Sequence, residues 1–169
     1  MTLTSRHFGP IDPSALDDAS TSTTITIGDG STITVRLFIA DPPQFRQDHV
    51  DQTDAAIDYF GQLDERARAL IVVAALDHES VPGRVFSSSI SLDDGQDLTP
   101  EEFTRELRLG AVTISPDGGT ESLDRVSITY VSKTTFSEQA FAAIVREGVG
   151  IVFAAVDEVE PRESSIFYR

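Results

Sequence analysis

Two histidines, each beside a carboxylate, are the residues of this chain whose types are best suited to chemistry. His49 follows Asp48, and His78 precedes Glu79. Two imidazoles and a carboxylate are a ligand set that zinc or iron accepts, and the same groups can serve as the acid–base pair of a hydrolytic enzyme. We therefore take His49, His78 and Glu79 as a candidate metal or acid–base site. The alternative is that each histidine lies at the edge of an apolar helix stripe without such a role.

The two histidines meet only if the elements that carry them fold back on each other. Asp41, followed by two prolines, predicts a helix start, with Asp41 as N-cap. Gly61 is a signal for the end of this helix. Asp64 can cap a second helix, and one stripe of it has residues at helical spacing: Ala67, Leu70, Ile71, Ala74 and His78. A linker this short predicts an antiparallel helix pair, in which His49 and His78 lie at the same end.

Other sites of known chemistry find no support in the sequence. There is no phosphate-binding glycine loop, no dinucleotide fingerprint, no nucleophile elbow and no HExxH. The acidic loop at residues 93–97 lacks the glycine and glutamate that a calcium loop needs. The sequence predicts no cofactor.

The remaining elements follow from alternation and turn residues. Residues 1–20 predict an extended lead-in, and the β-branched runs 22–28 and 32–39 around an Asp-Gly turn predict a hairpin. Residues 80–97 are left open, with a strand or an irregular segment at 85–92. Thr99, Pro100 and Glu102 predict a capped short helix that ends near residue 107.

The last third of the chain predicts strands at residues 109–115 and 126–130. In residues 136–156 a hairpin is favoured over a helix, and the tail at 158–169 is expected to pack loosely. The predicted fold is a single α+β domain over residues 1–169: an N-terminal β-hairpin, an antiparallel helix pair, a short helix and a C-terminal four-stranded antiparallel meander.

Composition restricts the partners. The chain has 169 residues, no cysteine, and a net charge of −15 from 28 acidic and 13 basic residues. Nucleic acids and anionic membranes are disfavoured because both attract basic surfaces, whereas a basic protein is a suitable partner. The absence of cysteine and of a signal-like apolar run in residues 1–10 predicts a cytoplasmic protein.

The segment HFGPID at residues 7–12 opens a pattern that continues with the Thr/Ile-rich hairpin, the helix pair at 45–76 and the strand at 109–116. In this order and spacing the chain resembles a bacterial family of uncharacterised proteins, the domain of unknown function number two thousand and four. The resemblance covers most of the chain. It implies a bacterial cytosolic protein with a final hairpin, and it implies no activity and no catalytic residues.

Three functions remain open. The first is a non-catalytic protein-interaction module, favoured by the charge and by the lack of a catalytic motif. The second is a metal-binding or hydrolytic enzyme that uses His49 and His78. The third is a homo-oligomeric structural protein, such as a homodimer that pairs through the apolar run at residues 151–156.

Overall fold

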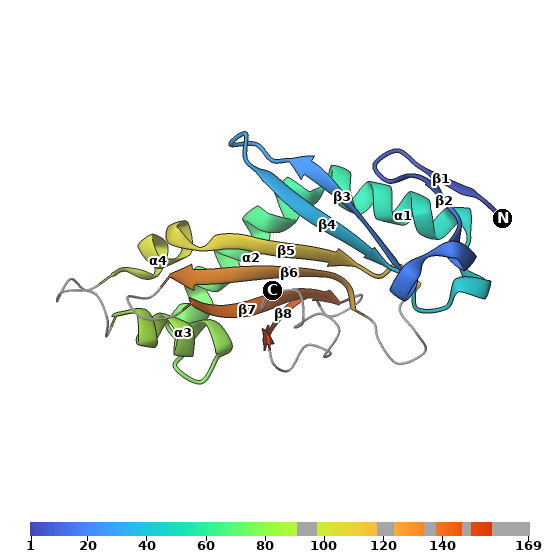
Figure 1. Ribbon diagram of the computed structural model, residues 1–169. Coiled ribbons are helices and arrows are strands. Elements are labelled where there is room, and N and C mark those ends of the chain that lie inside the picture. The colour runs from blue at the N-terminus through green and yellow to red at the C-terminus, as the bar shows by residue number, and fades with distance from the viewer. Residues whose placement is uncertain (91–97, 118–123, 134–137, 147–149, 157–169) are drawn as a thin grey trace.

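A six-stranded mixed sheet with helices on one face forms the body of the protein (Figure 1). The computed structural model describes residues 1–90, 98–117, 124–133, 138–146 and 150–156. The sheet order is β3-β4-β5-β6-β7-β8. The strands are β3 (Ser20–Thr26), β4 (Thr32–Phe38), β5 (Arg108–Ile114), β6 (Asp124–Lys133), β7 (Glu138–Arg146) and β8 (Gly150–Ala155).

The predicted hairpin and the predicted meander are both confirmed. β3 pairs antiparallel with β4, and β5 to β8 pair antiparallel in sequence order. At the first turn Gly30 has a φ of +83°, a conformation that glycine adopts at little cost. The sequence did not predict that both units belong to one sheet. They are joined by parallel pairing of β4 with β5, and the helices form the crossover that such pairing requires.

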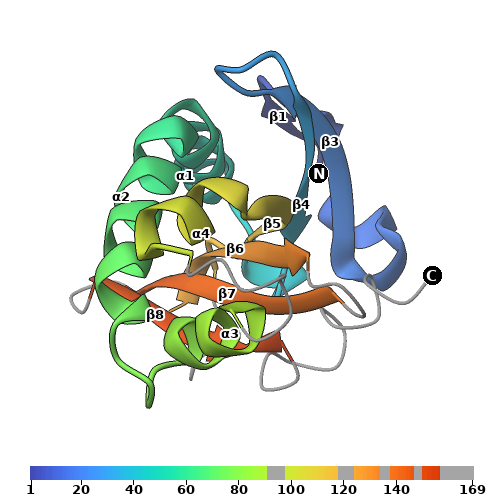
Figure 2. The ribbon, with the colours of Figure 1, turned by 90° about the vertical axis from the view of Figure 1, so that its left-hand side faces the viewer.

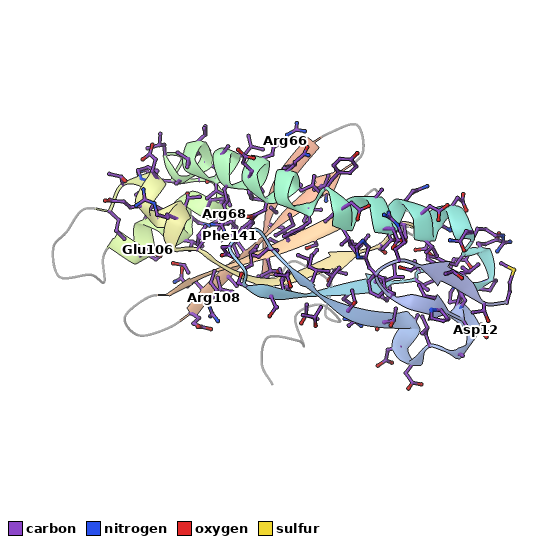
Figure 3. The ribbon with its side chains drawn as sticks, turned by 90° about the horizontal axis from the view of Figure 1, so that it is seen from above. Asp12, Arg66, Arg68, Glu106, Arg108 and Phe141 are labelled. Atoms are coloured by element: carbon purple, nitrogen blue, oxygen red, sulfur yellow. The ribbon has the colours of Figure 1, made fainter. Side chains whose placement is uncertain are left out.

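The helix pair is not antiparallel, and this prediction was wrong. α1 (Gln47–Asp58) and α2 (Phe60–Ala75) are separated by Tyr59 alone. The Tyr59 N–H donates to the Ala55 carbonyl, and the N–H groups of Gln62 and Leu63 donate to the Tyr59 carbonyl, so helical hydrogen bonding continues across the joint. The two helices follow each other end to end along the sheet (Figure 3).

The boundaries predicted for these two helices also differ from those in the structure. Gly61 lies inside α2 instead of ending a helix, and it does not have the positive φ of a C-terminal cap. Asp41 makes no cap hydrogen bond. It precedes a 3₁₀ turn (Pro42–Gln44), and α1 begins only at Gln47.

The shorter helices resolve the region that the sequence left open. Residues 81–90 are helical as α3 (Val81–Ile90), and neither a strand nor an irregular segment begins at residue 85. The capped helix is confirmed as α4 (Pro100–Glu106), in which Thr99 and Glu102 form a capping box. The loop at 93–97 and the tail at 158–169 lie outside the described residues.

The N-terminus differs from the predicted extended lead-in. β1 (Leu3–Ser5) and β2 (Gly9–Ile11) form a two-stranded hairpin, followed by two 3₁₀ turns (Pro13–Ala15 and Asp17–Ala19). The hairpin packs beside α1, apart from the main sheet (Figure 1). Its apolar side chains share a small core with β4, α1 and the segment between them, made of Leu3, Ile11, Leu37, Ile39, Phe45 and Val50.

The main core lies between the sheet and the helices (Figure 2). α2 contributes Ala67, Ile71 and Ala75, which meet the side chains of alternate residues on the central strands. Tyr130 of β6 and Phe141 of β7 are fully buried there. Within the described residues, no helix is long and apolar enough to cross a membrane.

Candidate functional site

Each histidine of the predicted metal site has local contacts of its own. His49 lies in the first turn of α1, where its Nδ1 accepts the backbone N–H of Arg46 at 3.1 Å and its ring packs on Phe45. His78 follows α2, and its Nδ1 lies 2.9 Å from Ser87 Oγ. These contacts fit the alternative interpretation, in which each histidine is placed by its own helix end.

The predicted approach of His49 and His78 does not occur. Because α1 and α2 run end to end, the two residues lie at opposite ends of the pair. The helical residues between them span roughly 35–40 Å at 1.5 Å per residue. Asp48 stays with His49 and Glu79 with His78. Within the part of the chain that the structure describes, no three His, Asp or Glu side chains group so as to hold a metal ion.

The structure brings together a polar cluster that the sequence reasoning missed, at the turn between β1 and β2. Asp54 of α1 is buried, and it accepts the Ser5 hydroxyl at 2.6 Å and the Arg6 N–H at 2.8 Å. One helical turn later, Asp58 accepts Arg6 Nη2 at 2.6 Å and lies 2.9 Å from His7 Nε2. The spacing of Asp54 and Asp58 is the only sequence signal for this contact.

This cluster contains serine, histidine and aspartate, but the Ser5 hydroxyl is not placed to act as a nucleophile. The Ser5 hydroxyl donates to Asp54 and accepts the N–H groups of both His7 and Phe8, so its hydrogen-bonding capacity is used. The hydrogen bonds from His7 and Arg6 lower the pKa of Asp58, which favours its charged form. These contacts hold the β1–β2 turn against α1. We call this cluster of Ser5, Arg6, His7, Asp54 and Asp58 the N-terminal latch.

A second polar cluster fixes α2 to the sheet. Asp64 of α2 accepts the Tyr130 hydroxyl at 2.7 Å and Arg68 Nε at 3.1 Å. Arg68 also donates to the carbonyls of Thr104 and Leu107 at the end of α4, and its guanidinium lies 5.2 Å from the centre of the Tyr130 ring. These contacts determine which side of α2 faces the protein and which side faces solvent (Figure 3).

The outward side of α2 carries an exposed apolar stripe. Leu70, Val73 and Leu76 follow at intervals of three residues, and their exposed fractions are 38%, 67% and 68%. Among the described residues, the other exposed large hydrophobic side chains are Met1 and Tyr59, and Tyr59 is the N-cap of α2. Apart from Met1, the exposed large hydrophobic residues in the described part of the chain thus belong to α2 and its two caps.

Exposed charged side chains flank this stripe at both ends. Arg66 precedes Leu70 by one turn and points away from the sheet (Figure 3). Asp77 and Glu79 follow Leu76, and both are exposed. The structure shows no ion pair for Arg66 or Glu79 among the described residues, whereas Arg68 on the inner side is paired. We call Arg66, Leu70, Val73 and Leu76 the α2 outer face.

Sequence reasoning assigned part of this face to the core. The predicted inner stripe included Leu70 beside Ile71, yet the structure buries Ile71 and exposes Leu70. The signal for the exposed side was the surplus of apolar residues in α2, which continue around the helix beyond the stripe needed for the core.

Comparison of the chain with protein-family models, with curated proteins and with solved structures gives no match.

Proposed function

We propose that this chain is a non-catalytic protein-interaction module of the cytoplasm that binds proteins through the α2 outer face. The observation that carries the proposal is the exposure of Leu70, Val73 and Leu76 on one side of a helix whose other side is fixed to the sheet. Contiguous apolar side chains exposed on one helix face are typical of protein interaction surfaces.

The charges support the same function. A net charge of −15 steers association with partners of suitable charge and opposes non-specific association between acidic surfaces. A basic protein partner remains a prediction of the sequence. The latch contributes no competing catalytic proposal, because its serine and carboxylates hold the N-terminal hairpin.

Site-specific photo-crosslinking tests this function. A crosslinking residue in place of Val73 is expected to give protein adducts in living cells, and the additional substitution Leu70→Asp is expected to abolish them. The matched control is the same residue in place of Thr24, which is exposed on β3 at the far edge of the sheet. Equal yields of adducts at both positions would contradict a binding role for the α2 outer face.

A further inference from the structure

The first seventeen residues form an arm that folds back on the rest of the protein. They contain β1, β2 and the first 3₁₀ turn, and we call residues 1–17 the N-terminal arm. Among the described residues, β1 and β2 pair with each other and with no strand of the main sheet. The arm lies beside α1 (Figure 1) and is joined to β3 through Asp18 and Ala19.

The arm covers apolar side chains that would otherwise face solvent. Leu3 and Ile11 of the arm are only 4% and 2% exposed. The side chains that they cover belong to β4, α1 and the segment between them: Leu37, Ile39, Phe45 and Val50. We call these four residues, with Asp54 and Asp58 of the N-terminal latch, the arm-binding surface. Its occupant has a defined chemistry, because apolar side chains and an arginine meet apolar side chains and two carboxylates.

The connection between the arm and β3 is strained. Asp18 and Ala19 both have a φ of +51°, and they are the non-glycine residues of the described chain with a positive φ. In this conformation the Cβ atom approaches a backbone carbonyl oxygen, which disfavours it for L-residues other than glycine. Asparagine and aspartate tolerate it best, and alanine has no side-chain hydrogen bond to offset the cost. The strain thus lies in the hinge and not in the contacts that the arm makes.

We propose that the N-terminal arm exchanges between two copies of this chain, so that the arm of each copy occupies the arm-binding surface of the other. The exchange keeps every contact of the arm, because the second copy offers the same residues. It also lets Asp18 and Ala19 extend, which removes their left-handed conformation. A short hinge under strain favours exchange of this kind. The inference goes beyond the proposed function and does not use the α2 outer face.

The short hinge determines where the two copies meet. The three steps from Asp17 to Ser20 span at most about 11 Å when extended. The β3 strands of the two copies must therefore begin close together. β3 is an edge strand of the main sheet, and its residues 20–26 carry no charged side chain. The net charge of −15 repels the two copies at long range, so salt favours the exchanged dimer by screening.

The first test is refolding of the full chain from urea at high protein concentration and high salt. Light scattering after gel filtration is expected to show a second species with a mass near twice the 18.3 kDa of one chain. A single species of monomer mass, at every concentration and salt tested, overturns the inference.

Substitution of the hinge tests the source of the exchange. Ala19→Gly removes the penalty of the left-handed conformation, because glycine adopts a positive φ at little cost. It should favour the closed monomer and weaken the dimer by about tenfold. Ala15→Gly is the matched control, because Ala15 belongs to the arm and has no positive φ. Its dimer should persist, and an equal effect of both substitutions would contradict the role of the hinge.

Charge reversal across the latch tests the exchange itself. Arg6 Nη2 donates to Asp58 at 2.6 Å, so Arg6→Asp and Asp58→Arg each place like charges between an arm and its own arm-binding surface. In an exchanged pair of the two variants, one contact is the native Arg6–Asp58 pair and the other is its reversal. When the variants are refolded together, the doubled mass should return, although each alone stays monomeric. A mixture that stays monomeric overturns the exchange.

A dimer of another kind is recognised by the same variants. A wild-type dimer that Val73→Asp dissociates and Ala19→Gly leaves intact would overturn the exchange and assign association to the α2 outer face. A monomer whose α2 outer face still gives position-specific adducts removes the exchange and keeps the proposed function. An exchanged dimer without such adducts does the reverse.

Discussion

Tyr130 and Asp64 connect the sheet to the helix layer through one short hydrogen bond, 2.7 Å from Oη to Oδ1. Tyr130 is fully buried in the sheet, and Asp64 lies on the inner edge of α2. This bond sets the rotation of α2 about its axis, because Arg68 on the next turn contacts the same carboxylate and the same ring. The exposed position of Val73 follows from that rotation.

Tyr130→Phe is expected to lower the free energy of unfolding by about 1.5–3 kcal/mol, the usual contribution of a hydrogen bond to a charged acceptor. The ring remains, so no cavity is created. Tyr59→Phe is the matched control, because Tyr59 is 60% exposed and its change should stay within about 0.5 kcal/mol. Urea unfolding of the two variants measures the difference, and equal midpoints would contradict a stabilising role for the bond.

The same tyrosine predicts a loss of stability at alkaline pH. Burial, reinforced by the Asp64 charge, raises the pKa of Tyr130 well above its usual range. Its neutral form is thus favoured in the folded chain, and this contribution is fully present below the unfolded pKa of about 10. Above pH 10 the unfolded tyrosine ionises and the contribution is lost. Between pH 9 and 11 the wild type should lose more stability than Tyr130→Phe, and parallel pH profiles would argue against this assignment.

The N-terminal latch predicts a large effect from one buried carboxylate. Asp54→Ala leaves the Ser5 hydroxyl and the Arg6 N–H without their acceptor, which should cost about 2–3 kcal/mol. Asp51→Ala is the control, because Asp51 is exposed on the same helix. Hydrogen exchange should show that protection is lost first in the β1–β2 hairpin. A uniform loss over the whole chain would indicate that the latch stabilises the entire fold.

The elements that could be predicted from the sequence are those whose formation depends on residues close together in the chain. The β3–β4 hairpin follows from its Asp-Gly turn and β-branched strands, and the α4 start follows from the Thr99–Glu102 capping box. The meander follows from alternation and turns between consecutive strands. The parallel pairing of β4 with β5 joins residues 77 positions apart, such as Val35 and Val112, and no local pattern encodes it.

The predicted approach of His49 to His78 was wrong because it depended on one glycine. Gly61 was interpreted as a helix end, which would have folded α2 back along α1 and brought His49 toward His78. A glycine ends a helix by adopting a positive φ, and Gly61 instead continues the helix. The stripe at Leu70 was visible in the sequence, but its outward orientation depends on the distant contact with Tyr130.

Gly61 in the first turn of α2 and Gly83 in the first turn of α3 predict opposite effects of the same substitution. A Cβ on Gly83 would lie 1.9 Å from the Asp77 carbonyl oxygen, so Gly83→Ala must displace the turn that carries Asp77, at a cost of about 1–3 kcal/mol. A Cβ on Gly61 meets nothing within 4 Å, so Gly61→Ala should stabilise α2 by about 0.5–1 kcal/mol.

Urea unfolding midpoints measure both changes in stability. A stabilising effect of Gly83→Ala would contradict the packing of α3 against the turn that follows α2.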